Sequence, residues 1–248
     1  MAVDLDYLDH LARETTRFAD VLEGVAPDTR VPSCPDWNVD DLIWHLAEVQ
    51  WFWAQVVGRR LVTPAQVRAL THPERPADRR QLRDLQHLSG RELHNVLAQT
   101  PPDTVCWSWA PEQTARFSRR RQAHEALIHR VDAELAAADR TPIDPALASD
   151  GVAELLTLMY GADQPVPADA PTVGVTAADT GDRWWVDVGG LEIGLGVRRD
   201  GPAPDAEISG SAADLDCYLW NRPSGVITRS GDPSALDALD VVLARGVK

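Results

Sequence analysis

The spacing of the apolar residues changes once along the chain, near Gly161, and this change limits the folds open to the sequence. Up to that point apolar residues recur three and four positions apart over long segments, which predicts amphipathic helices. From residue 172 onward the chain holds short runs of β-branched and aromatic residues bounded by glycines, which predicts strands joined by turns. A chain of 248 residues is long enough for two domains, each with its own core.

Five helices are predicted in the first part of the chain. The second should begin near Asn38, because asparagine is a good N-cap and the following Asp40 and Asp41 place negative charge in the first turn. The segments between the helices are rich in proline and glycine, so they are expected to be loops. The expected helices are 4–23, 38–57, 77–98, 116–138 and 144–160, and the expected loops are 24–37, 58–76 and 100–115.

The second part of the chain follows a proline-rich linker over residues 162–171. Glycine pairs and Gly-Asp steps lie between its first three apolar runs, which predicts a β-meander. The expected strands are 172–176, 183–188, 191–197, 206–209 and 225–229, and the expected helices are 212–220 and 233–245. We therefore expect a two-domain protein, with a four-helix bundle within residues 1–161 and a small α+β domain over residues 170–248.

The charge and composition of the chain exclude several classes of protein. A net charge of −14 repels phosphate backbones, so no nucleic-acid partner is expected. No segment approaches the roughly 18 uninterrupted apolar residues of a membrane span, and the first 30 residues lack a signal-peptide core, so we expect a cytoplasmic protein with no membrane partner. The three cysteines are far apart, which argues against a disulfide framework and a thiolate zinc site.

Three residues could form a metal site by their spacing. His124 and His129 are five positions apart, about 140° around a helix, so they cannot bind one metal as an HExxH pair does. Glu125 and His129 are four apart and project from one face, within about 40° of each other. His45 faces inward from the predicted second helix, where it would complete three ligands and leave one position open. That arrangement is typical of a catalytic divalent-metal site.

Simpler interpretations of the same residues remain open at this point. An inward-facing histidine such as His45 is most often a hydrogen-bonded core residue, and a Glu–His pair four positions apart is often a surface ion pair. The periodicity also places His124 near the centre of its apolar stripe and puts Glu125 and His129 on the flank, which favours His124 as the buried histidine.

Longer motifs add a family resemblance. Residues 31–46 read VPSCPDWNVDDLIWHL and residues 124–134 read HEALIHRVDAE. Both resemble the signature segments of the mycothiol-dependent maleylpyruvate isomerase family, whose N-terminal half is a DinB-like four-helix bundle. Residues 208–236 are similar to the small sterol-carrier-like α+β domain of that family. The resemblance covers both halves of the chain.

The resemblance implies a ligand set and a chemistry. It places zinc, or another divalent metal, on His45, Glu125 and His129, and it implies mycothiol, the low-molecular-weight thiol of actinobacteria, as thiol cofactor or co-substrate. It also places the family's arginine at Arg222, where a guanidinium would bind the carboxylate of a substrate at the domain interface. The alternative for Arg222 is a surface position after a helix.

A metal-bound thiol is deprotonated at neutral pH, so the implied enzyme is a mycothiol-dependent isomerase or S-transferase acting on a small electrophile, with or without a carboxylate. The alternatives are a metal-dependent hydrolase that uses metal-bound water and a non-catalytic protein that binds a small ligand.

Two further residues in the signature segments have open roles. Asp132 either orients a ligand histidine or pairs with Arg130 or a neighbouring helix, and Cys34 is either a structural thiol or a nucleophile.

Overall fold

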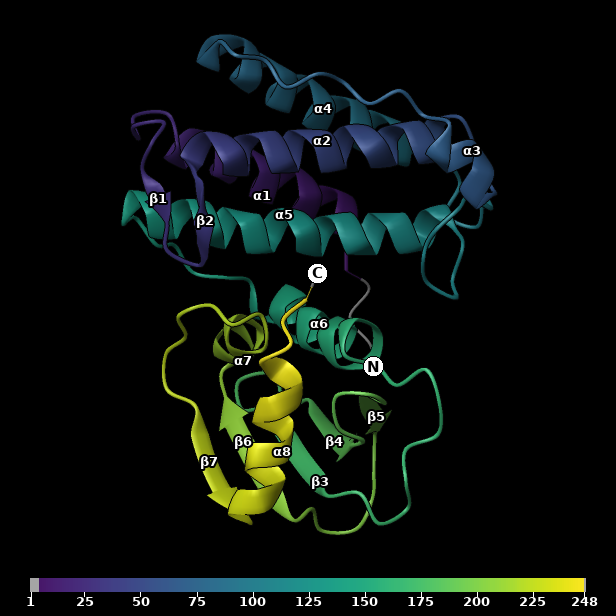
Figure 1. Cartoon of the computed structure of the whole chain (residues 1–248), viewed down its shortest axis with the longest axis vertical. Coiled ribbons are helices and arrows are strands. Elements are labelled where there is room, and N and C mark those ends of the chain that lie inside the picture. Colours follow the sequence, from purple (N-terminus) through teal and green to yellow (C-terminus); the bar gives the residue numbers. More distant parts are fainter. Residues whose placement is uncertain (1–4, 248) are drawn as a thin grey trace. The chain divides into compact units, whose positions relative to one another are not determined.

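The structure is a computed structural model and describes residues 5–247. Its contacts divide the described chain into two compact units, residues 5–141 and residues 142–247 (Figure 1). The boundary lies earlier than the predicted one after Gly161, because helix α6 (Pro145–Glu154) packs on α7 (Ala212–Leu219). Periodicity identified a helix there but could not show which core its apolar face joins.

The first unit is a bundle of four long helices. Helix α1 packs on α4 and α5, and α2 packs on the same two helices, so each helix has two principal neighbours in the bundle (Figure 1). Each helix lies within three residues of its expected bounds. They are α1 (Tyr7–Val21), α2 (Val39–Gly58), α4 (Arg79–Gln99) and α5 (Ala115–Ala137), and a short α3 (Pro64–Arg68) follows α2.

Helix α2 begins after Asn38, as the sequence predicted, and its start is fixed by a reciprocal cap. The Asn38 side chain accepts a hydrogen bond from the backbone N–H of Asp41 at 2.9 Å, and the Asp41 carboxylate accepts one from the N–H of Asn38 at 2.9 Å. This capping box satisfies backbone donors that the first turn of a helix leaves unpaired.

The segment before α2 is a small β-hairpin and not the loop that was expected. Strand β1 (Arg30–Val31) pairs antiparallel with β2 (Cys34–Asn38). Val31 is fully buried among Phe18, Val39 and other core residues, and Trp37 packs against the same cluster. The hairpin is therefore held by packing on the bundle, a contribution that its proline-rich sequence does not reveal.

The second unit contains a five-stranded sheet with the order β5-β4-β3-β6-β7. Strands β3 and β6 are parallel and all other neighbours are antiparallel, so the predicted meander is present as β3-β4-β5. Helix α8 (Pro233–Leu243) packs on β3, β4 and β6. The strands are β3 (Thr172–Ala177), β4 (Arg183–Val188), β5 (Leu195–Arg198), β6 (Ala206–Gly210) and β7 (Thr228–Gly231), and a π-helical turn over Leu155–Met159 follows α6.

Two strands begin later than predicted. The expected strand at 191–197 starts at Leu195, and the one at 225–229 starts at Thr228.

Within the described residues, none of the helices combines the length and the apolar character that crossing a membrane requires.

Candidate metal centre

Three side chains from two neighbouring helices converge in the bundle. His45 comes from α2, and Glu125 and His129 come from α5. The Oε1 atom of Glu125 lies 3.3 Å from Nε2 of His45 and 3.1 Å from Nε2 of His129. One ligand atom from each residue lies within 4.8 Å of the other two. The structure thus brings together the three residues that spacing and resemblance both pointed to.

The geometry fits a divalent metal ion. A tetrahedral ion with bonds of about 2.0–2.2 Å separates neighbouring ligand atoms by about 3.3 Å, close to the distances of Glu125 Oε1 from the two histidine nitrogens. Two imidazole nitrogens and one carboxylate oxygen form a donor set that suits zinc. Among residues 5–247, this is the one group of three or more His, Cys, Asp or Glu with such an arrangement.

Asp132 contacts the far side of the His129 ring. Its Oδ2 atom lies 3.0 Å from Nδ1 of His129, and the carboxylate is fully buried. Of the two roles considered for Asp132, the structure supports contact with the histidine, because Arg130 instead binds Glu14 and Glu134. A carboxylate at Nδ1 keeps the proton on that nitrogen and leaves Nε2 able to bind a metal.

Charge around Glu125 favours its ionised form. Burial by itself raises the pKa of Glu125, but the charge of Arg121 and hydrogen bonds from His129 and His45 outweigh burial and hold the pKa well below its usual value. Nη2 of Arg121 donates to Oε2 of Glu125 at 2.5 Å, which leaves Oε1 for the histidines. The sequence contained a signal for this contact, since Arg121 precedes Glu125 by one helical turn.

His129 is strongly basic without a metal. Burial lowers its pKa, but hydrogen bonds to Asp132 and Glu125 and their negative charges raise the pKa to about 9. A metal ion that binds Nε2 must therefore displace a proton from this ring.

Trp37 of the hairpin packs over both histidines. Its ring centroid lies 4.7 Å from that of His45 and 6.2 Å from that of His129. The side chains of His129 and Glu125 are 8% and 15% exposed, whereas that of His45 is 32% exposed. The centre is thus accessible mainly at His45. Local spacing gives no signal for a role of Trp37, because its position in a proline-rich segment carries no periodicity.

The remaining candidates are placed as follows. His124 is buried, with its ring 6.3 Å from that of Tyr7, but His129 is buried as well. The periodicity correctly predicted a buried His124, and His129 is buried too because α5 is buried on nearly all sides. Cys34 is half-buried, with Sγ 3.9 Å from Oδ2 of Asp132.

Arg222 follows α7 in the second unit, where its Nη1 atom donates a hydrogen bond to the carbonyl of Trp220 at 2.7 Å. Its role toward a substrate stays a prediction.

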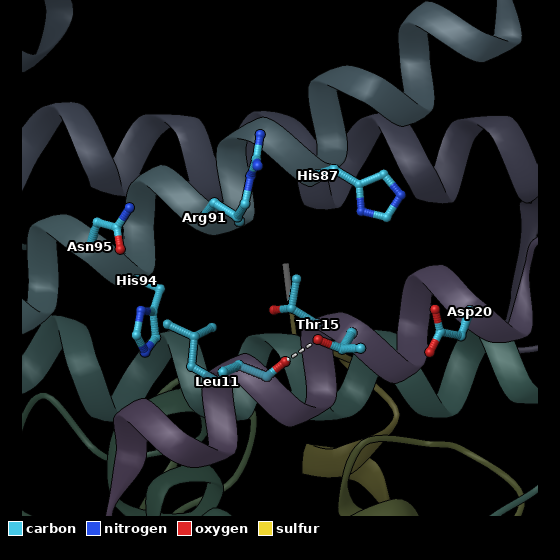
Figure 2. A pocket seen from close by; sticks show the side chains of 10 residues that line it. Leu11, Thr15, Asp20, His87, Arg91, His94 and Asn95 are labelled. Carbon is cyan, nitrogen blue, oxygen red and sulfur yellow. Dashed lines mark hydrogen bonds between the residues drawn. The ribbon is translucent and has the colours of Figure 1, made fainter.

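A groove of about 280 Å³ lies between α1 and α4. Because α2 and α5 form the opposite pair in the bundle, the groove is on the other side from the candidate centre. Figure 2 shows His87, Arg91 and His94 of α4 with Thr15 and Asp20 of α1. None of the predicted metal ligands lines it.

Comparison with known proteins agrees with this architecture. No curated protein matches the sequence. A crystal structure of the mycothiol-dependent maleylpyruvate isomerase aligns with a TM-score of 0.64 at 18% identity, covering 92% of this chain and 95% of the other. A histidine-to-alanine mutant of that isomerase aligns with a TM-score of 0.63 at 16% identity over the same shares of the two chains. The family model of the mycothiol maleylpyruvate isomerase N-terminal domain matches residues 8–134, about half of the sequence, and the chain belongs to this family.

Proposed function

We propose that this protein is an enzyme that binds a divalent metal ion, zinc by its donor set, through His45, Glu125 and His129. In this proposal it activates mycothiol for addition to a small electrophile. The observation that carries the proposal is the position of Glu125 Oε1 at 3.3 Å and 3.1 Å from the two imidazole nitrogens. Membership of the mycothiol maleylpyruvate isomerase family supports mycothiol as the thiol.

A bound zinc ion would supply Lewis acidity that keeps a thiol deprotonated at neutral pH. The chain's own residues would prepare the centre for it. Arg121 holds one oxygen of Glu125 and directs the other toward the histidines, and Asp132 sets the tautomer of His129. Three protein ligands leave a coordination position for a thiol. Trp37 packs on both histidine rings, and His45 is the more accessible of the two.

Two reaction classes follow from an activated thiol at this centre. In an isomerisation, the thiol adds to a conjugated carbon, the carbon–carbon bond rotates, and elimination returns the thiol. In an S-transfer, the thiol sulfur replaces a leaving group on the electrophile and remains in the product. For a substrate with a carboxylate, we assign Arg222 as the group that binds it, since a guanidinium can hold a carboxylate through two parallel hydrogen bonds.

The test begins with metal content. Purified wild-type protein should contain nearly one zinc per chain, and the Glu125→Ala/His129→Ala variant should contain none while its circular dichroism is unchanged. The matched control is Glu48→Ala/His72→Ala, which removes an exposed Glu–His pair 3.0 Å apart outside the centre and should leave zinc binding intact. A wild-type protein that takes up no added zinc would overturn the proposal.

The thiol is tested separately, with zinc-loaded protein and a small conjugated electrophile. Turnover should require mycothiol and should disappear in the double variant of the centre. Hydrolysis of the electrophile at equal rates with and without thiol would instead identify a metal-dependent hydrolase. Replacement of Arg222 by Lys should raise KM for a carboxylated electrophile and leave KM unchanged for its uncharged amide.

A further inference from the structure

The β1–β2 hairpin contacts the metal centre through side chains that the proposed chemistry does not use. The hydroxyl of Ser33 donates to Oδ1 of Asp132 at 2.5 Å. The other carboxylate oxygen, Oδ2, lies 3.0 Å from Nδ1 of His129 and 3.9 Å from Sγ of Cys34. Ser33 and His129 therefore contact opposite oxygens of one buried carboxylate.

This arrangement restricts how Asp132 can turn. A carboxylate held at one oxygen can still rotate about the bond that joins it to Cβ, and its contact with His129 would then lengthen. A second hydrogen bond, at the other oxygen, fixes the plane of the group. Because Asp132 is fully buried, water has little access to replace the Ser33 hydroxyl as a donor.

The hairpin also connects the two helices that carry the ligands. Ser33 contacts α5 through Asp132, and Asn38, at the end of β2, caps α2, which carries His45. Between them, Trp37 packs on the rings of His45 and His129. One short segment, residues 33–38, thus touches both sides of the centre.

We infer that Ser33 is a positioning residue of the metal centre, which acts through Asp132 to hold the His129 ring in the orientation that binds the ion. This inference rests on the proposed function, because it concerns the same ligands. It assigns the hairpin a role in metal affinity that is separate from its packing on the core. Removing a group that hydrogen-bonds a metal ligand directly typically changes metal affinity by about 10–100-fold, and because Ser33 acts one contact further out we expect the lower end of that range.

The experiment compares four proteins that differ only at residue 33. Ser33→Ala removes the hydroxyl, Ser33→Thr keeps it, and Ser33→Val has nearly the shape of threonine without it. We expect the zinc Kd, measured by competition with a chromophoric chelator, to rise about tenfold in Ser33→Ala and Ser33→Val and to stay near the wild-type value in Ser33→Thr. The visible spectrum of the cobalt(II)-loaded proteins should separate the same two groups, since it reports ligand geometry.

The Val and Thr variants keep the test decisive if Ser33→Ala does not fold. Equal zinc affinity and equal cobalt spectra in Ser33→Val and Ser33→Thr would overturn the inference, including the case in which Ser33→Val only lowers the Tm of the metal-free protein. The proposed function fails by a different result, namely a wild-type protein that binds no zinc, and the role of Ser33 then fails with it. Zinc binding by the wild type with no effect of the hydroxyl overturns the role of Ser33 alone.

Discussion

Arg121 donates to Oε2 of Glu125 from one helical turn earlier, and the two groups form a buried ion pair 2.5 Å long. The Arg121 side chain is only 4% exposed, so the pair brings two opposite charges together in a buried position. The same carboxylate presents its second oxygen to His45 and His129. Arg121 thus supplies positive charge beside the candidate centre in the metal-free protein.

Replacing Arg121 with Gln should destabilise the metal-free protein by at most about 3 kcal/mol, because it removes one of the two cations, Arg121 and protonated His129, that compensate the buried Glu125 carboxylate. In excess zinc the loss should be smaller, since the ion provides part of the missing positive charge. Urea unfolding with and without zinc measures both values. The control is Arg116→Gln, which breaks an exposed pair with Asp103 and should cost less than about 1 kcal/mol in either condition. An equal loss with and without zinc for Arg121→Gln would contradict this electrostatic account.

Asn38 should stabilise the bundle through the cap of α2. Asn38→Ala removes the acceptor for the Asp41 N–H and should lower the free energy of unfolding by about 1 kcal/mol. Thr63→Ala removes the equivalent acceptor from α3, which has five residues and an exposed cap, so it should change stability by less than about 0.5 kcal/mol. Chemical denaturation of both variants measures the two changes in the free energy of unfolding. Equal changes would show that the Asn38 cap stabilises the protein no more than the exposed cap at Thr63.

Apolar spacing was sufficient to predict the long helices and the approximate positions of the strands along the chain, because most of these elements bury a continuous apolar face. It was insufficient for the hairpin before α2 and for α3. Strand β1 has two residues and α3 has five, too few for any period to appear. The hairpin depends on contacts such as Val31 with Phe18, which join residues from separate elements.

The candidate centre was predictable only in part for a related reason. The spacing of Glu125 and His129 follows from helix geometry, but the approach of His45 depends on how α2 packs against α5, and that residue was assigned with help from the family motifs. The contact between Ser33 and Asp132 joins residues 99 positions apart and leaves no trace in local spacing. Arg121 could have been found, because its distance from Glu125 is the four-residue spacing already used for His129.

Gly90 allows α4 to approach α1 closely beside the groove of Figure 2. A Cβ atom at this position would lie 2.8 Å from Cγ2 of Thr15 and 3.1 Å from Oε1 of Gln50. Gly90→Ala should therefore destabilise the protein by about 1–2 kcal/mol, since overpacking outweighs the gain in helix propensity. Adding Thr15→Ser removes the clashing methyl group and should recover part of the lost stability.

Gly58→Ala is the control, because a Cβ atom there would have its nearest contacts at 3.5 Å, which permits a methyl group. Thermal unfolding of these variants measures the differences, and a Gly90→Ala protein as stable as Gly58→Ala would refute the close approach.

Glu134 should give the bundle an acid-dependent share of its stability. Burial raises the pKa of Glu134, but hydrogen bonds from Thr141 and Arg17 and the charge of Arg130 together hold it below its usual value of 4.5. Because the pKa is lower in the folded state than in the unfolded state, this stabilisation is complete above about pH 4.5 and is lost as the pH falls through the folded-state value. Glu134→Gln should therefore cost about 3 kcal/mol at pH 7, and its difference from the wild type should shrink below pH 4.5. Urea unfolding of both proteins from pH 7 to pH 3 tests this, with Asp103→Asn as an exposed control that should show almost no difference. A difference for Glu134→Gln that stays constant down to pH 3 would mean that the carboxylate is not the source of the stabilisation.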